Sequence, residues 1–232
     1  MDSRIEQSTK IVAGMATIPE RIDTLKMVLD SVVNQVDELI LALNGFEKIP
    51  DWLYLYPNLE AHLTTNEKGD ANKFLKVDEV DGYYFSMDDD IVYPKNYVQR
   101  YIKAIDSNRC LITIHGSDIP KRMIKSYYKG KKMRSHCLNN LNKAVFVDVA
   151  GSGVSGFHTS FLKLRYDDFR HPNMADIWLS KQCHEQGVNR LCIKHDAGWI
   201  RGGLNKGRST IYESHKNNDS IQTKAVNDFN WR

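Results

Sequence analysis

The sequence predicts an α/β fold in which a central, mainly parallel sheet is flanked by helices. The first observation is a strand–helix–strand order near the N-terminus: an apolar run at residues 10–17, helical spacing at 25–35 and a second apolar run at 38–43. Strands connected in this order form a parallel, right-handed unit. The second is the length of 232 residues, which suits one such domain. The third is a hydrophobic fraction of 41% with 26% charged residues, as in ordinary soluble globular proteins.

Local signals mark the ends of the first elements. Thr17 can cap the first helix, and Pro19 can sit at its first position, where a backbone donor would be unpaired anyway. Asn44 and the glycine after it end the second strand. Next we expect a short strand at 59–63 and a polar loop that enters a helix ending near residue 80.

The second half of the chain continues the alternation of strands and helices. The elements expected there are helices at 98–105 and from 174 onward, and strands at 111–115, 144–149 and 190–194. Residues 151–156 are rich in glycine and are expected to form a loop that a ligand can approach closely. No repeat and no linker interrupts the chain, so we expect one domain over residues 1–232.

Three consecutive aspartates, Asp88, Asp89 and Asp90, follow an apolar, aromatic strand expected at 83–85. Because side chains alternate along a strand, Asp88 and Asp90 should point to one side and Asp89 to the other. Two carboxylates on one side repel each other, and a hard divalent cation relieves that repulsion. This pattern predicts a metal site; the alternative is a solvated acidic turn without a ligand.

The same strand end should meet the ends of the first two strands. In open α/β sheets, ligands bind beyond the carboxyl ends of the strands. On that rule Thr17, Arg21 and Asn44 should line one crevice together with residues 88–90.

Composition and charge limit the partners of the protein. A net charge of +3 is too small to indicate nucleic acid, and no apolar run approaches the ~18 residues of a membrane span. The four cysteines lack metal-ligand spacing and are expected to be free thiols, so we expect a cytoplasmic protein. Residues 119–142 are strongly basic: they form either a mobile, solvated loop or a lid that contacts an anionic acceptor or the inner face of a membrane.

Several segments occur in an order that resembles a known enzyme family. They are Thr17-Ile18-Pro19-Glu20-Arg21, Leu43-Asn44-Gly45, Gly69-Asp70-Ala71-Asn72-Lys73-Phe74, Gly82-Tyr83-Tyr84-Phe85, Asp88-Asp89-Asp90-Ile91-Val92-Tyr93-Pro94 and Asp176-Ile177-Trp178. The set resembles GT-A-fold glycosyltransferases of the family 2 type, and is similar to bacterial transferases that build capsular, chondroitin- or heparosan-like chains. The resemblance extends over residues 11–199. It implies a Rossmann-like GT-A domain with a nucleotide-sugar half (1–100) and an acceptor half (101–232).

The resemblance also implies roles for particular residues. Mn²⁺ or Mg²⁺ would be held by Asp90 with Asp88, and would bridge the diphosphate of a UDP-sugar donor. The residues implied in binding the nucleotide sugar are Thr17, Pro19, Arg21, Asn44, Asp70, Lys73, Asp88 and Asp89. A histidine from the C-terminal segment is a further metal ligand in such enzymes; His215 is the first candidate and His195 the second, and either could equally be a surface histidine.

Asp176, at the start of a helix, stands where related enzymes carry a catalytic base. In an inverting transfer this carboxylate would take the proton of the acceptor hydroxyl of a growing glycan or lipid-linked glycan. If the enzyme instead retains configuration, Asp176 would orient the acceptor or stabilise positive charge on the sugar. The competing functions are a sugar-phosphate nucleotidyltransferase, against which the absence of glycine at residues 17–21 counts, and a non-catalytic calcium or carbohydrate module.

Overall fold

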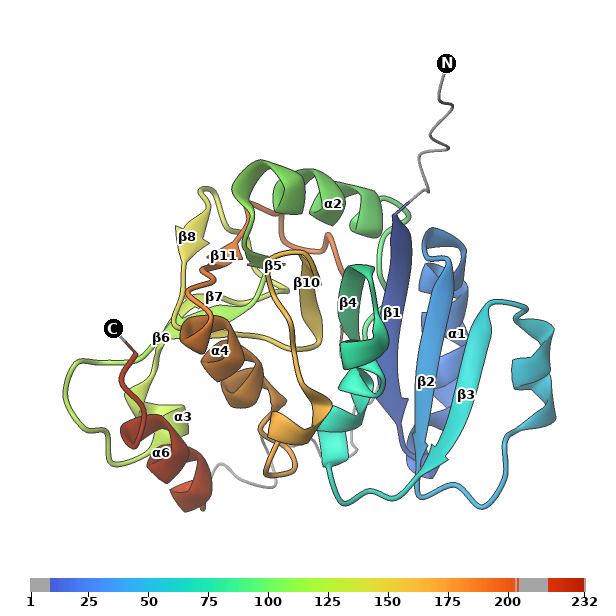
Figure 1. Ribbon diagram of the computed structural model, residues 1–232, viewed down its shortest axis with the longest axis horizontal. Coiled ribbons are helices and arrows are strands. Elements are labelled where there is room, and N and C mark those ends of the chain that lie inside the picture. The colour runs from blue at the N-terminus through green and yellow to red at the C-terminus, as the bar shows by residue number, and fades with distance from the viewer. Residues whose placement is uncertain (1–8, 203, 205–216, 232) are drawn as a thin grey trace.

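An eight-stranded sheet runs through the centre of the molecule in the order β3-β2-β1-β4-β10-β5-β11-β8 (Figure 1). The computed structural model describes residues 9–202, 204 and 217–231. The strands of this sheet are β1 (Lys10–Thr17), β2 (Glu38–Asn44), β3 (Leu59–Thr64), β4 (Gly82–Asp88), β5 (Leu111–Thr113), β8 (Val145–Phe146), β10 (Val154–His158) and β11 (Arg190–Cys192). Strands β3, β2, β1 and β4 are parallel, as are β5 and β11, whereas β10 and β8 are antiparallel to their neighbours. The expected mainly parallel α/β architecture is therefore confirmed.

Helices cover both faces of the sheet. On one face α1 (Ile22–Val32) and α2 (Tyr97–Asn108) pack in one apolar core; on the other, α4 (Ala175–Glu185) and the 3-10 helix η4 (Gly69–Phe74) pack in a second. Strand β2 alternates between these cores, since Leu39 and Leu41 belong to the first and Ile40 to the second. Such alternation buries both faces of a strand, which is why β2 is almost entirely apolar.

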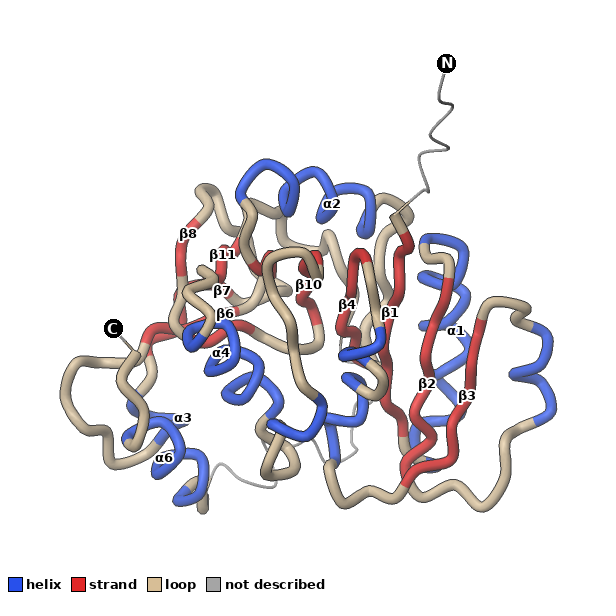
Figure 2. Tube along the Cα trace, in the orientation of Figure 1, coloured by secondary structure: helices blue, strands red, loops and turns tan. Residues whose placement is uncertain are grey.

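A smaller antiparallel sheet lies beside the large one, in the order β7-β6-β9 (Figure 2). Its strands are β6 (Gly116–Asp118), β7 (Lys132–Ser135) and β9 (Val149–Ala150). Next to it, the short helix α3 (Tyr127–Gly130) packs against the C-terminal helix α6 (Ser220–Asn227). The remaining 3-10 helices are η1 (Pro19–Arg21), η2 (Val33–Gln35), η3 (Asp51–Leu55), η5 (Val77–Glu79) and η6 (Tyr166–Asp168).

Three expectations about individual elements are wrong. The segment leading to residue 80 forms two short 3-10 helices, η4 and η5, because Lys76 between them has a left-handed backbone with φ of 60°. The run 144–149 is divided between β8 and β9, which belong to different sheets. The glycine-rich run 151–156 is a loop only to residue 153, after which β10 pairs between β4 and β5.

Gly156 explains why a glycine-rich segment is a central strand here. A Cβ at this position would lie 2.9 Å from two carbons of the Phe85 ring and 3.1 Å from a ring carbon of Tyr101. Glycine lets both aromatic rings pack directly against the backbone of β10. The position therefore marks close packing in the sheet and not a ligand-binding loop.

The basic segment 119–142 is not a solvated loop throughout. It contains α3 and β7, and within it Ile124 and Tyr127 are buried. Hydrogen bonds from Ile124 N–H to Asn227 Oδ1 (3.0 Å) and from Tyr127 N–H to Thr223 Oγ1 (2.8 Å) attach it to α6, an element that the polar C-terminal sequence did not predict. None of the helices in the described part of the chain has the length and apolar character needed to cross a bilayer.

Candidate functional site

A cavity of about 930 Å³ opens at the carboxyl ends of the parallel strands. Thr17, Asn44 and Asp88, the last residues of β1, β2 and β4, all line it, as the topology of the sheet predicts. Of the residues predicted to form a site, those that line this cavity are Thr17, Arg21, Asn44, Asp70, Lys73, Asp88, Asp89, Asp90 and Asp176. Pro19, the first residue of η1, is not among the lining residues.

The ammonium group of Lys73 interacts with the carboxylates of the cavity. Its side chain is only 4% exposed; it forms an ion pair with Asp88 and lies 3.5 Å from the hydroxyl of Ser152. Burial would lower the pKa of Lys73, but the carboxylates of Asp88 and Asp70 outweigh burial and raise it. Lys73 is therefore a fixed positive charge that faces a cavity wide enough for a ligand.

Asp88 is held in place by a hydrogen bond of its backbone N–H as well as by the ion pair with Lys73. The N–H of Asp88 donates to the Tyr93 hydroxyl at 2.8 Å, and this hydroxyl donates to the carbonyl of Gly153 at 2.6 Å. A Cβ on Gly153 would come within 1.8 Å of Asp88 Oδ2, so only glycine leaves room for this carboxylate. The turn at 151–153 and the end of β4 thus form one rigid unit.

Asp89 pairs with a different cation, Arg21 at the end of η1. Its carboxylate is 2% exposed and accepts a hydrogen bond of 2.5 Å from Arg21 Nη1. Burial raises the pKa of Asp89, while the Arg21 guanidinium acts against this rise. Asp88 and Asp89 thus form ion pairs with different cations. The alternation of side chains expected for residues 88–90 stays a prediction, since β4 ends at Asp88 and residues 89 and 90 form a turn. Asp90 also lines the cavity.

Asp70 joins η4 to the start of α4, and Asp176 joins α4 to the turn at 151–153. Asp70 Oδ2 accepts from the N–H of Ala175 at 3.3 Å, whereas its Oδ1 is buried and has no hydrogen-bond partner among the described residues. Burial raises the pKa of Asp70 to about 6, against the lowering effect of Lys73. Asp176, in the first turn of α4 as predicted, accepts from the N–H of Ser152 at 2.7 Å and remains partly exposed to the cavity.

Asn44 lines the cavity, but its amide is occupied within the protein. Its Nδ2 donates to the carbonyl of Gly69 at 2.9 Å, and its Oδ1 accepts from Thr64 Oγ1 and Asn72 Nδ2, each at 2.7 Å. These bonds fix η4 to the end of β2. Base recognition by Asn44 remains a prediction that would require some of these bonds to be exchanged.

The two histidines considered as metal ligands have different outcomes. His215 lies outside the described residues. His195 is 1% exposed, and its Nδ1 lies 2.9 Å from the carbonyl of Ile193, to which it donates. His195 does not line the cavity, so it is a buried structural residue and not a ligand there.

The basic segment supplies one wall of the cavity. Tyr127, Tyr128 and Lys131 line it, and Lys131 Nζ lies 4.3 Å from the centre of the Tyr127 ring. Burial lowers the pKa of Lys131, against the raising effect of Asp176. Of the basic residues predicted to contact an anionic partner, Lys131 is the one whose position at the cavity is defined here.

Sequence reasoning missed His115 and His136, which also line the cavity. His115 follows β5, which is parallel to β4, so the strand-end rule that placed Asp88 also applies to it. Burial lowers the pKa of His115 to about 4, in opposition to Asp176, so this imidazole is neutral near neutral pH. His136 follows the short strand β7, and no pattern in the sequence connects it with the cavity.

Comparison with known proteins yields no match: neither a protein-family model nor a curated protein sequence aligns significantly with this chain. The cavity combines carboxylate oxygens suited to a hard cation, a buried lysine and a partly buried arginine suited to phosphate oxygens, and a further carboxylate at the start of α4.

Proposed function

We propose that the protein is a metal-dependent glycosyltransferase of the GT-A type, which transfers a sugar from a UDP-sugar to a growing glycan or lipid-linked glycan in surface polysaccharide synthesis. One observation carries the proposal: Lys73, Asp88, Asp90 and Asp176 line a single cavity at the carboxyl ends of the parallel strands. These groups are the ones needed to bind a diphosphate through a cation and to accept a proton nearby.

In this proposal the nucleotide-sugar donor binds at the carboxyl ends of β1, β2 and β4. Lys73 is a buried cation that can bind diphosphate oxygens and stabilise the charge left on them when the sugar–phosphate bond breaks. Arg21, held by Asp89, places a second cation beside the same cavity. Because both cations are fixed by ion pairs, the site needs little rearrangement to receive an anionic donor.

Mn²⁺ or Mg²⁺ fits the residues present. Asp88 and Asp90 offer hard carboxylate oxygens at the cavity, and the Asp88 side chain is 37% exposed although Lys73 pairs with its Oδ1. Asp90 with Asp88 would hold the ion. When bound, such an ion supplies Lewis-acid neutralisation of the leaving diphosphate.

The acceptor binds beside α4, the turn at 151–153 and α3. The N–H of Ser152 fixes one oxygen of Asp176, and the other oxygen is the candidate to accept the proton of the attacking hydroxyl. This arrangement favours an inverting transfer. Lys131, on the same side of the cavity, is placed to contact an anionic acceptor.

The first test is product analysis with a panel of nucleotide sugars, with and without Mn²⁺. Release of nucleoside diphosphate that depends on the metal is the expected result. Release of pyrophosphate from a sugar phosphate and a nucleoside triphosphate would instead identify a nucleotidyltransferase. No release of either would indicate a non-catalytic binding module.

The second test replaces the proposed metal ligand. Asp90→Ala should abolish turnover and remove the dependence of UDP binding on Mn²⁺, with the fold intact by circular dichroism. Asp51→Ala, which removes an exposed carboxylate outside the cavity, is the matched control and should leave both unchanged. Near-normal turnover by Asp90→Ala in buffer treated with a chelator would refute this metal site.

A further inference from the structure

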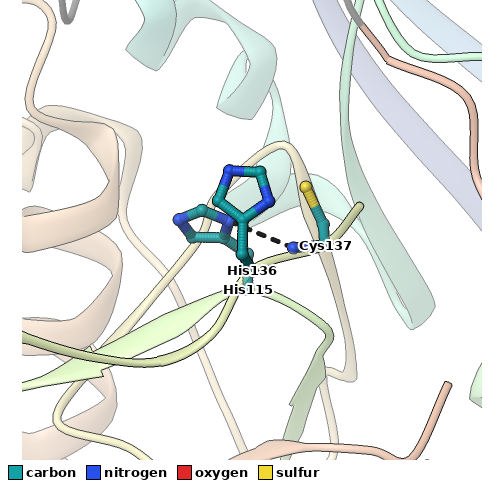
Figure 3. A group of neighbouring side chains, drawn as sticks. All are labelled: His115, His136 and Cys137. Carbon is teal, nitrogen blue, oxygen red and sulfur yellow. Dashed lines mark hydrogen bonds between the residues drawn. The ribbon is translucent and has the colours of Figure 1, made fainter. Parts of the chain in front are cut away.

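We propose that the protein has a second metal site, for a thiophilic or borderline ion such as Zn²⁺, formed by His115, His136 and Cys137. The inference does not depend on the proposed transferase activity. One ligand atom from each of the three side chains lies within 4.8 Å of the others (Figure 3). No other group of three or more histidine, cysteine or acidic ligands meets this criterion in the described part of the chain.

The fold brings these residues together from two places in the sequence. His115 follows β5, at the junction with β6, and the other two residues follow β7 directly. Strands β6 and β7 pair antiparallel, with Gly116 opposite Ser135, so the residues next to that pair are held side by side. The sheet therefore fixes the cluster without requiring a sequence motif.

The distances suit a small ion after minor adjustment. In a tetrahedral zinc site with bonds of 2.0–2.3 Å, the ligand atoms lie about 3.3–3.8 Å apart. Atoms that already lie within 4.8 Å of one another reach that spacing by side-chain rotations of about 1 Å. All three residues are partly exposed, so an ion can reach them without unfolding.

The hydrogen bonds that an ion would replace are weak. Nδ1 of His115 accepts from the N–H of Cys137 at 3.4 Å, and Nδ1 of His136 accepts from the N–H of Leu138 at 3.3 Å. Both contacts exceed the usual length of a good hydrogen bond, so exchanging them for coordination costs little. The two imidazoles pack edge to face, with centroids 5.0 Å apart.

The ligand chemistry separates this site from the carboxylates of β4. Two imidazoles and one thiolate favour Zn²⁺ or Co²⁺, whereas carboxylates favour Mg²⁺ and Mn²⁺. Three protein ligands leave a fourth position open, as in zinc sites that bind water or a substrate. Since His115 and His136 both line the cavity, an ion held by them would lie at the cavity wall.

Metal titration of the chelator-treated protein, in the absence of any nucleotide sugar, tests the site. With Co²⁺ as probe, we expect one high-affinity equivalent that shows a thiolate-to-cobalt charge-transfer band and tetrahedral visible absorption. Addition of Zn²⁺ should displace Co²⁺ and remove both the charge-transfer band and the visible absorption. Equilibrium dialysis followed by elemental analysis gives the stoichiometry.

Variants identify the ligands. Cys137→Ser should remove the charge-transfer band, and both Cys137→Ser and His136→Asn should weaken Zn²⁺ binding by at least about tenfold. The controls are Cys110→Ala and His171→Asn, which remove a thiol and an imidazole outside the cluster and should bind Zn²⁺ as the wild type does. Asp90→Ala should also bind Zn²⁺ as the wild type does, which distinguishes this site from the proposed Mn²⁺ site.

A thermal measurement provides a second readout. Zn²⁺ should raise the Tm of the wild type and of the controls, because binding to the folded state stabilises it, and should raise that of Cys137→Ser by less at the same concentration. The proposal is overturned if Co²⁺ gives no charge-transfer band, or if Cys137→Ser binds Zn²⁺ with unchanged affinity.

Discussion

The consecutive aspartates at the end of β4 have separate partners. Asp88 pairs with Lys73, and Asp89, buried at 2% exposure, pairs with Arg21. Each cation comes from a different segment, η4 or η1, so the triplet joins both segments to the central strand. Identical neighbouring residues thus have different roles, because each pairs with a different cation.

Asp176 is the residue through which the proposed mechanism is most directly tested. Asp176→Asn keeps an oxygen that can accept the Ser152 N–H at the present 2.7 Å, but it removes the basic carboxylate. We therefore expect the transfer rate to fall by about 10²–10⁴-fold, with donor affinity little changed. Single-turnover kinetics and UDP binding measure the two quantities separately.

Two results bear on this role. Asp167→Asn, which removes an exposed carboxylate outside the cavity, should transfer at the wild-type rate. NMR of the product gives its anomeric configuration. An α-linked product from an α-linked donor would exclude the base role even if Asp176→Asn is inactive, because retention does not require a base to activate the acceptor.

Asp70 should make stability depend on pH. Its pKa is raised to about 6 from an ordinary 3.8, chiefly by burial, so the folded protein binds this proton more tightly than the unfolded chain. The free energy of unfolding should consequently fall as pH rises from about 4 to about 6, and then remain level. The shift corresponds to a loss on the order of 3 kcal/mol.

The measurement is denaturant unfolding of the wild type and Asp70→Asn across this pH range. The amide is neutral throughout, so the wild type should lose stability relative to Asp70→Asn as pH rises. Other titrating groups contribute to both proteins and largely cancel in the difference. A difference that is constant from pH 4 to pH 7 would mean that Asp70 ionises without hindrance.

At the scale of elements, the short helix η4 determines where Lys73 lies. It packs against β1 at Gly14, where a Cβ would come within 2.0 Å of both the Lys73 carbonyl and the Tyr84 hydroxyl. That hydroxyl donates to the Lys73 carbonyl at 2.6 Å. The contact is possible only because Gly14 has no side chain.

Gly14→Ala should therefore displace η4 from β1. The atoms in the way include backbone, so we expect a stability loss of about 1–3 kcal/mol together with weaker UDP binding. Denaturant unfolding and calorimetry measure these effects. Gly45→Ala is the control: its φ of +74° makes alanine strained, but nothing lies within 4 Å of the new Cβ, so stability alone should fall. Equal UDP affinity in wild type and Gly14→Ala would show that η4 tolerates the displacement.

The sequence predicts the elements whose hydrophobic pattern is complete within a short window. Strand β1 matches the expected residues 10–17, and α1 and β2 differ from expectation only at their ends. The failures are elements that depend on distant partners. Strand β10 exists because glycine fits against two rings from other elements, and α6 exists through its contacts with residues 124–128.

At the scale of the whole molecule, the cavity combines residues that sequence reasoning could and could not find. Asp88, Thr17 and Asn44 were predictable because strand ends in a parallel sheet meet at one edge. The cluster of His115, His136 and Cys137 was not, since two segments 21 residues apart form it and its spacing matches no metal motif. Tertiary pairing of β6 with β7 creates it.

The C-terminal helix α6 connects the end of the chain to the wall of the cavity. Asp219, immediately before α6, accepts hydrogen bonds at its Oδ2 from Ser126 Oγ (2.7 Å) and from the N–H of Tyr128 (2.9 Å). Burial opposes its ionisation, but these bonds and one from Thr223 lower the pKa of Asp219. The attachment is therefore present at neutral pH and weakens as pH falls below the ordinary value of 3.8.

Asp219→Ala should release α3 from α6 without unfolding the central sheet. Loss of hydrogen bonds to a buried carboxylate costs about 1–3 kcal/mol, and here the cost falls on local opening of the segment that carries Lys131. Hydrogen exchange at pH 7 should accelerate in Tyr127–Gly130 while β1 and β4 stay protected. Asp228→Ala, which removes an exposed ion pair with Lys224 on the same helix, should exchange as the wild type does. Unchanged exchange at Tyr127–Gly130 in Asp219→Ala would show that the Asp219 carboxylate has no part in fixing α3, and that other contacts hold this wall of the cavity.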